Sequence, residues 1–324
     1  MKIGIIADDF TGATDIASFL VENGLSAIQF NGIPTGLKSI DTDAVVISLK
    51  SRSIAKEEAI AESLAALKWL QAQDCEQVYS KYCSTFDSTK EGNIGPVTDA
   101  LLAAMGEKMT IISPALPVNG RTVYKGYLFV LDELLADSPM RNHPLNPMRD
   151  SSLLRLMDAQ AEGKTGLITS DELDKGTAFV KARLSALSES GIRYVVMDAL
   201  TEAHLLTQGE AVKAMKLVTG GSGLAIGLAK AHQTSGGNHE QAKEMGYPVA
   251  GKAIVLSGSC SAMTNKQVAH YQEKAPSFGI EVAKVVGETD RKAYVDTILQ
   301  WLKQQESKEL APLIYATSDP ANLA

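Results

Sequence analysis

The sequence predicts an α/β protein, with a mostly parallel sheet and helices on both faces in a first domain, and a second, incomplete α/β domain after it. Three observations lead to this prediction. Short apolar runs typical of buried strands alternate with helical segments along most of the chain. Several of these runs end in polar segments rich in glycine and hydroxyl side chains. A polar, glycine-containing stretch at 233–251 then separates the last strands and helices from those before it.

Length, charge and cysteine content narrow the class of protein. The 324 residues exceed what one domain of about 150 residues needs. A net charge of −7, from 31 basic and 38 acidic residues, disfavours general binding to nucleic acid or membrane surfaces. No apolar run approaches the length of about 18 residues expected for a transmembrane helix, and no signal-peptide pattern is evident. The three scattered cysteines indicate reduced thiols, so we expect a cytoplasmic protein.

The first half of the chain predicts strands and helices in alternation. The apolar run at 3–7 is the first strand, and a helix follows it at 14–23. Further strands are expected at 27–30, 44–49, 77–82 and 109–113, with helices at 56–71 and 97–105. The segment 124–150 has no clear periodicity and is expected to be irregular. A loop of that length inside a compact domain is usually functional.

The second half continues the pattern and then changes. Strands are expected at 166–168, 194–198 and 216–219, and helices at 153–161, at 175–188 and up to 231. We place a first domain at 1–235, a linker at 236–251 and a second domain at 252–324. This second domain offers strands only at 253–256, 281–285 and 312–316, with a helix ending at 274 and another at 289–304. Three strands are few for an independent α/β domain, so we expect it to be incomplete.

Two adjacent carboxylates, Asp8 and Asp9, directly follow the first strand. In a parallel α/β sheet the ligand site lies beyond the carboxyl ends of the strands. Neighbouring carboxylates disfavour each other's ionisation unless a cation or a donor compensates. One of them can cap the next helix, but capping needs a single carboxylate. The pair therefore indicates a magnesium ion, a sugar hydroxyl or proton transfer, and Asp8 is the candidate ligand of the metal.

Three other predicted strand ends carry positive and polar side chains. Arg52 can bind a carboxylate or a phosphate through two parallel hydrogen bonds. Lys81 and Asp87 belong to a hydroxyl-rich segment, and Asn119 and Arg121 follow the next strand. Each of these ends alone fits a solvated loop. Because parallel strands end at one edge of the sheet, their convergence with the aspartate pair favours a site for an anionic ligand.

Glycine-rich turns give weaker signals. Gly221 and Gly223 precede a helix but lack the third glycine of the dinucleotide fingerprint. Such a turn can still present backbone N–H groups to an anion at the start of the helix. Ser257, Gly258 and Ser259 offer the same chemistry after a later strand, with two hydroxyl groups in addition. We take these five residues as candidate nucleotide contacts, with a purely structural turn as the alternative.

Four separated motifs resemble those of the four-carbon acid sugar kinases. They are IADDFTGA at 6–13, KYCSTFDST at 81–89, PALPVNGR at 114–121 and LSGSCS at 256–261. The resemblance implies an N-terminal sugar-acid-binding domain at 1–235 and a C-terminal nucleotide-binding domain at 252–324. It also implies transfer of the γ-phosphate of ATP to the terminal hydroxyl of a four-carbon acid, with Mg²⁺ as cofactor. A 3-oxo acid is expected, and D-threonate and D-erythronate are the alternatives.

The resemblance assigns motifs to the substrate side or the ATP side, and the hypothesis of a kinase then suggests roles for the charged residues. The resemblance places Asp8, Asp9 and Thr11 with the 81–89 motif on the substrate side, and Ser259 on the ATP side. Asp9, or Asp8 in its place, is expected to accept the hydroxyl proton or to hold the metal. Arg52, Lys81 and Arg121 would bind the acid's carboxylate or the transferring phosphoryl group. Members of this family continue past the match with a second glycine-rich motif, so we expect weak ATP binding by this chain.

Two further function classes remain as alternatives. A chain that binds a sugar acid without phosphorylating it would follow from an incomplete nucleotide-binding domain. An NAD-dependent dehydrogenase is disfavoured, because Ile226 occupies the place of the third glycine of its fingerprint. The sequence leaves the oligomeric state open, including a homo-oligomer.

Overall fold

The computed structural model describes residues 2–36, 40–143, 145–233, 251–286, 291–305 and 310–318. The chain divides into two compact units, Met1–Met245 and Gly246–Ala324, and each is considered by itself. The predicted linker at 236–251 lies outside the described residues except for its last position. The predicted domain boundaries therefore stay predictions.

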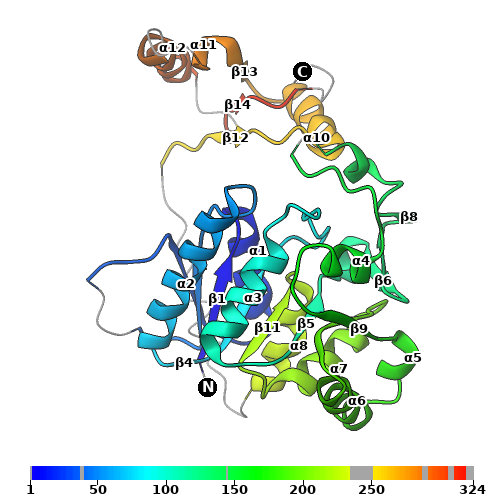
Figure 1. Ribbon diagram of the computed structural model, residues 1–324. Coiled ribbons are helices and arrows are strands. Elements are labelled where there is room, and N and C mark those ends of the chain that lie inside the picture. The colour runs from blue at the N-terminus through cyan, green and yellow to red at the C-terminus, as the bar shows by residue number, and fades with distance from the viewer. Residues whose placement is uncertain are drawn as a thin grey trace. The chain divides into compact units, whose positions relative to one another are not determined.

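The first unit is built on one parallel sheet (Figure 1). Its neighbouring strands all pair in the parallel sense, which confirms the predicted fold class. Parallel pairing brings the carboxyl ends of all the strands to one edge of the sheet. In spatial order the eight strands are β2 (Ala27–Asn31), β3 (Ala44–Ser48), β1 (Lys2–Ala7), β4 (Cys75–Lys81), β11 (Leu217–Gly220), β5 (Thr110–Ser113), β10 (Ile192–Met197) and β9 (Lys164–Ile168).

Helices cover both faces of this sheet and create two hydrophobic cores (Figure 1). Successive side chains of a strand point to opposite faces. In β1, Ile6 therefore joins one core, and Ile3 and Ile5 join the other. One core includes α2 (Lys56–Ala72), α3 (Ile94–Met105) and α4 (Leu153–Asp158). The other includes α1 (Phe10–Glu22), α5 (Ser170–Leu173), α6 (Thr177–Glu189), α7 (Glu202–Val212) and α8 (Gly223–His232).

The segment 124–150, expected to be irregular, instead contributes two strands to a small antiparallel sheet. Its strands are β6 (Arg121–Tyr124), β7 (Tyr127–Val130) and β8 (Glu133–Leu134), flanked by the 3-10 turns η1 (Pro117–Asn119) and η2 (Pro139–Asn142). The turn between β6 and β7 is bound to the main sheet, because Lys125 and Gly126 donate backbone hydrogen bonds of 2.7 and 2.9 Å to the buried carboxylate of Asp198. This anchor, distant in sequence, is why local periodicity did not reveal these strands.

The second unit has a three-stranded parallel sheet in the order β12 (Val255–Ser257), β14 (Leu313–Tyr315) and β13 (Ser277–Gly279). Its helices are α10 (Ala262–Gln272), α11 (Val282–Val286) and α12 (Arg291–Lys303). The predicted strand at 281–285 is wrong, since most of that segment is α11. Its valines favour a strand locally, but β13 already fills the place beside β14, and Ile280 closes the ladder on Tyr315.

One further helix was predicted with the wrong start, and two helices were missed. Helix α1 begins at Phe10 rather than at Thr14, because Asp9 caps it there. Helices α5 and α7 were not predicted at all. Both carry polar faces and few regularly spaced apolar residues, so tertiary packing rather than local pattern fixes them.

Candidate active site

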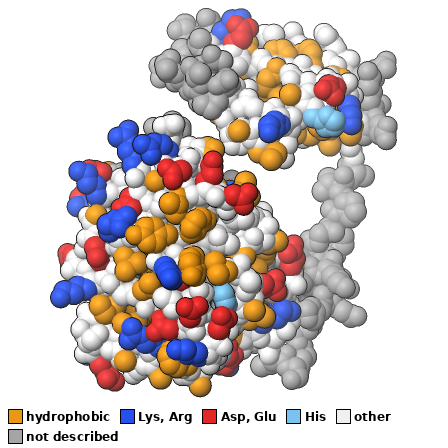
Figure 2. All heavy atoms as spheres, turned by 90° about the vertical axis from the view of Figure 1, so that its right-hand side faces the viewer, with side chains coloured by type: hydrophobic (Ala, Val, Ile, Leu, Met, Phe, Trp, Pro, Cys, Tyr) orange, Lys and Arg blue, Asp and Glu red, His pale blue; other side chains and the backbone are white. Residues whose placement is uncertain are grey.

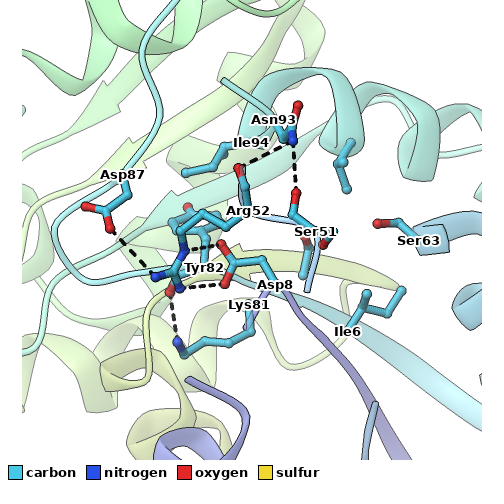
Figure 3. Close-up of a pocket in the computed structure, with 12 residues that line it drawn as sticks. Ile6, Asp8, Ser51, Arg52, Ser63, Lys81, Tyr82, Asp87, Asn93 and Ile94 are labelled. Atoms are coloured by element: carbon cyan, nitrogen blue, oxygen red, sulfur yellow. Dashed lines mark hydrogen bonds and ion pairs between the residues drawn. The ribbon is translucent and has the colours of Figure 1, made fainter. Parts of the chain in front are cut away.

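Three adjacent strands deliver the charged side chains of the site. Strand β1 ends immediately before Asp8 and Asp9, β4 ends at Lys81, and β3 ends four residues before Arg52. Because β3 and β4 flank β1 in the sheet, these residues meet at its carboxyl edge. Figure 3 shows Asp8, Arg52, Lys81 and Asp87 around one small pocket.

Arg52 is the cation that compensates the aspartate pair. Its Nε and Nη2 donate to the two carboxylate oxygens of Asp8, at 2.8 and 2.7 Å, in a fork (Figure 3). The same Nη2 lies 2.7 Å from Asp9 Oδ1, and Nη1 lies 3.7 Å from Asp87 Oδ2. One guanidinium group therefore holds three carboxylates together.

The electrostatics of this cluster reflect its burial. Burial raises the pKa of Asp8 above its ordinary value of 3.8, although the hydrogen bond to Arg52 and the charges of Arg52 and Lys81 act against the rise. For Arg52, burial acts to lower the pKa, but the bond and charge of Asp8 outweigh it and raise the pKa. The guanidinium consequently stays charged at every physiological pH.

Asp9 differs from Asp8 in how many of its carboxylate oxygens are hydrogen-bonded. Its Oδ1 accepts both from Arg52 and from the backbone N–H of Gly12, at 2.9 Å, and so caps α1. No hydrogen bond reaches its other oxygen within the described part of the chain. Its side chain is 28% exposed, against 18% for Asp8. Of the two predicted catalytic aspartates, Asp9 is therefore the one open to a ligand.

Lys81 supplies the second positive charge. Its ammonium donates to the carbonyl of Tyr82 at 2.9 Å, and among the described residues no carboxylate lies within 4.0 Å of it. The side chain is buried at 3% exposure beneath the first turn of α1. A Cβ at Gly12 would lie 2.8 Å from Lys81 Nζ and 2.3 Å from Asp9 Oδ1. Glycine at position 12 is thus what lets the helix approach both groups.

Asp87 is oriented by its own loop. Thr85 donates to Asp87 Oδ1 at 2.8 Å, and the sulfur of Cys83 lies 2.9 Å from the Thr85 hydroxyl. Burial raises the pKa of the Cys83 thiol, which therefore stays neutral. The Oδ2 of Asp87 lies 3.7 Å from Arg52 Nη1, so Asp87 helps to orient the guanidinium.

The remaining substrate-side candidates show no bond to this cluster in the described residues. Thr11 is exposed in the first turn of α1, next to the cluster. Asn119 is exposed in η1, and Arg121 begins β6, with a guanidinium that donates to the Asn119 carbonyl. Neither Asn119 nor Arg121 shows a bond to the charged cluster in the described residues, so their substrate role stays a prediction.

The structure gives Gly221 and Gly223 a packing role. A Cβ at Gly221 would lie 2.5 Å from the carbonyl oxygen of Pro114, and one at Gly223 would lie 2.1 Å from that of Ala115. The β11–α8 turn therefore passes so close to the segment after β5 that only glycine fits. This packing accounts for both glycines without a nucleotide, and their predicted ATP contact has no support from the geometry.

The second candidate nucleotide loop is open. Ser257 bonds Thr317 at 2.7 Å between hydroxyl groups, which joins the ends of β12 and β14. Apart from its two chain neighbours, no atom of the described residues lies within 4 Å of where a Cβ of Gly258 would stand, and Ser259 is exposed. Ser261 caps α10 by accepting from Thr264 at 3.1 Å. An exposed turn at the start of a capped helix suits phosphate groups.

Magnesium does not fit Asp8 in this arrangement. Both of its oxygens accept hydrogen bonds from Arg52, which a divalent cation would have to displace. Within the described ranges, no group of three or more acidic, histidine or cysteine side chains is placed to hold a metal.

The described ranges also contain no helix long and apolar enough to cross a membrane.

Comparisons with known proteins identify the family. A model of a sugar-binding N-terminal domain matches residues 3–228, and a model of a nucleotide-binding C-terminal domain matches residues 254–324. The chain belongs to the four-carbon acid sugar kinase family. It is 59% identical over 325 residues to a 3-oxo-tetronate kinase of Pectobacterium atrosepticum, covering 100% of this chain and 77% of that protein. A 3-oxo-tetronate kinase of Escherichia coli is 56% identical and is covered over 83% of its length.

Solved structures agree with this assignment. A Salmonella typhimurium protein, described as a tRNA synthase, superposes with a TM-score of 0.85 at 58% identity, covering 99% of this chain and 76% of that one. A Haemophilus influenzae protein gives a TM-score of 0.74 at 51% identity, with the same coverage of both chains. The comparisons confirm the predicted family and the predicted class of enzyme, a phosphotransferase.

Proposed function

We propose that this chain carries out the ATP-dependent phosphorylation of the 4-hydroxyl of 3-oxo-tetronate. Identity of 59% over the whole chain to a protein named 3-oxo-tetronate kinase is the observation that carries the proposal. The charged cluster at the end of β1 supplies the chemistry, since phosphoryl transfer depends on positioning and on neutralised charge. D-threonate and D-erythronate are the substrates that the test below must separate from it.

Asp9 is the proposed general base. Its side chain is 28% exposed, one oxygen accepts no hydrogen bond from the described residues, and the other is fixed by Gly12 and Arg52. A carboxylate held in this way accepts the proton of the attacking hydroxyl as the bond to phosphorus forms. Asp8 instead keeps Arg52 in place, because both of its oxygens are occupied.

Lys81 is the proposed partner for the negative charge of the acid. The carboxylates of Asp8, Asp9 and Asp87 outnumber the two cationic side chains, Arg52 and Lys81. An anionic substrate is therefore expected to bind next to the cation that has no carboxylate partner. The Nε and Nη2 of Arg52 donate to carboxylates and its Nη1 lies 3.7 Å from Asp87, whereas Lys81 binds one carbonyl. The pocket beside them has a volume of about 30 Å³, room for roughly one water molecule. The acid would therefore bind at its mouth.

The nucleotide is proposed to bind at the turn formed by Ser257, Gly258 and Ser259, in the unit that matches the nucleotide-binding domain model. When bound, Mg²⁺ would neutralise the phosphate charge of the nucleotide. The described residues suggest no protein ligand for it. The cytoplasmic location and the oligomeric state stay predictions.

Transfer RNA is a poor alternative ligand. The net charge of −7 opposes binding to a polyanion. Figure 2 shows acidic and basic side chains interspersed over the visible face of the larger unit, without one dominant basic area. The aspartate-rich cluster at the sheet edge adds to this unfavourable charge.

The test is a substrate panel assayed with the full-length gene product. ATP and Mg²⁺ are supplied with 3-oxo-tetronate, D-threonate or D-erythronate, and the product is identified by ³¹P NMR and mass. We expect the highest kcat/KM with 3-oxo-tetronate and phosphorylation at the terminal hydroxyl. A higher kcat/KM with either of the other acids would replace the proposed substrate, and no phosphorylated acid from any of the three would contradict the proposed function.

A further inference from the structure

The loop that carries Arg52 follows β3 and is held from one side by β1. The backbone N–H groups of Ser51 and Arg52 both donate to the carbonyl of Asp8, at 3.0 and 3.2 Å. These two bonds fix where the loop begins. They leave the carbonyl groups of the loop, which point the other way, to be satisfied by a different part of the chain.

A single side-chain amide satisfies them. The Nδ2 of Asn93 donates to the carbonyl of Ser51 at 2.9 Å and to that of Ile54 at 3.0 Å, and it lies 3.4 Å from that of Arg52. Figure 3 shows the Asn93 amide pointing at the backbone of Ser51 and Arg52. Asn93 is 8% exposed and comes from a segment about forty residues further along the chain.

This use of Asn93 replaces its usual one. The residue stands immediately before α3, where an asparagine ordinarily caps the helix by accepting a backbone N–H. Here its backbone is already helical, with φ −97° and ψ −10°, and its side chain makes no capping bond. The amide is committed to the Arg52 loop, and side chains from other segments, Gln160 and Ser88, accept the first backbone N–H groups of α3 instead.

We propose that Asn93 is a positioning residue for the phosphoryl transfer, acting through Arg52. This inference rests on the proposed function. Asn93 fixes the backbone of the loop, so the guanidinium reaches Asp8 and Asp9 with its fork aligned. Without the amide, the buried carbonyl of Ser51 and the partly buried carbonyl of Ile54 lose this donor, and the loop relaxes. Arg52 then no longer holds Asp9 with one oxygen free for the hydroxyl.

A purely stabilising role for Asn93 is the competing explanation, and Gln160 offers a matched control. Gln160 also has a side-chain amide, and this amide contacts the start of α3 from another part of the chain. Its Oε1 accepts from the backbone N–H of Gly95 at 2.9 Å and from the Ser88 hydroxyl at 2.6 Å. None of the hydrogen bonds that the described residues show for Gln160 reaches the Arg52 loop. Asn93→Leu and Gln160→Met each remove an amide with little change in volume.

The first measurement compares steady-state kinetics of the two variants in the full-length gene product. We expect Asn93→Leu to lower kcat with 3-oxo-tetronate at least tenfold while KM for ATP changes less than twofold. Gln160→Met should stay within threefold of wild type. If Asn93→Leu does not fold, Asn93→Ser, which keeps one donor, is compared in its place. Equal losses in the Asn93 and Gln160 variants would overturn the proposal.

The second measurement asks whether the effect passes through Arg52. In an Arg52→Lys background the fork is already lost, so adding Asn93→Leu should lower kcat less than twofold further. The proposal would be overturned if the loss of kcat in the double variant equalled the product of the losses in the two single variants, because Asn93 would then act independently of Arg52.

The third measurement does not depend on activity. The Nε–H of Arg52, bound to Asp8 at 2.8 Å, should give a protected ¹⁵N resonance in wild type. We expect this resonance to be broadened or lost in Asn93→Leu and retained in Gln160→Met. An unchanged Arg52 resonance in Asn93→Leu would overturn the positioning role, whereas wild type inactive on all three acids would contradict the proposed function alone.

Discussion

The two candidate ligand sites are built in opposite ways. At the end of β1, Arg52 binds three carboxylates, Lys81 is buried, and Gly12 is required by the closeness of its neighbours. At the end of β12, by contrast, Gly258 is surrounded by open space and Ser259 is exposed. The first site is already organised before a ligand arrives, and the second leaves its donors in solvent. A site that is organised in advance loses function when one contact is changed, and the predictions below use this difference.

The largest effect is expected for Asp9→Asn. The amide keeps the shape of the cap but cannot accept a proton, so kcat should fall by about 10² or more. Asp15→Asn is the control, because Asp15 lies on the same helix and accepts a hydrogen bond from Ser222 outside the cluster. Steady-state kinetics with 3-oxo-tetronate provide the measurement. Activity of Asp9→Asn within threefold of wild type would remove Asp9 from the mechanism.

Arg52→Lys should follow in size. Lysine cannot reproduce a planar fork, so the hold on Asp8 and Asp9 is lost and kcat should fall by roughly ten- to a hundredfold. Arg155 makes the same fork with Asp150, at 2.7 and 2.5 Å, but its side chain is 60% exposed. Arg155→Lys should change neither the rate nor the melting temperature measurably. Similar behaviour of the two variants would mean that burial of the Arg52 fork has no consequence.

A third prediction compares glycines from the two sites. Gly12→Ala forces the new Cβ against Asp9 and Lys81, so we expect a loss of about 1–3 kcal/mol in the free energy of unfolding and a lower affinity for the acid. Gly258→Ala meets open space and should leave the unfolding free energy unchanged within about 0.5 kcal/mol. Urea denaturation measures both. A destabilised Gly258→Ala protein would show that the β12 turn is as closely packed as the β1 end.

The smallest effect concerns pH. Because burial raises the pKa of Asp8, the folded state binds its proton more tightly than the unfolded state does. The contribution of Asp8 to stability is therefore fully present below about pH 3.8 and is lost as pH rises through the folded-state pKa. The unfolding free energy of wild type, relative to Asp8→Asn, should decline over that range in urea titrations. If the unfolding free energy of wild type relative to Asp8→Asn rose with pH instead, the interaction with Arg52 would have a larger effect on the pKa of Asp8 than burial has.

The sequence was sufficient to predict the parallel sheet, because strands buried on both faces form apolar runs that helices separate. It also placed Asp8, Asp9, Arg52 and Lys81 at one edge, since that follows from parallel strands. It could not show that Arg52 pairs with Asp8, because this depends on β3 lying beside β1. Nor could it separate the roles of the two aspartates, which differ only in which oxygens are already bonded.

Some sequence patterns that are typical of ligand binding or helix capping have a different structural role in the folded protein. Gly221 and Gly223 have the pattern of an anion-binding turn, but the carbonyl groups of Pro114 and Ala115 explain them. Asn93 has the pattern of a helix cap, which hides its contact with a loop distant in sequence. Such contacts depend on tertiary packing, which local patterns do not encode.

The central claim is that the acid and the nucleotide bind at separate sites of opposite construction. Isothermal titration of the full-length gene product with 3-oxo-tetronate and, separately, with ATP tests it most directly, using Lys81→Met and Ser259→Ala. Lys81→Met should weaken acid binding by about tenfold or more, as expected for a lost bond to a charged group, and leave the Kd for ATP unchanged. Ser259→Ala should do the reverse. Loss of ATP binding in Lys81→Met, or unchanged acid binding in that variant, would contradict the account.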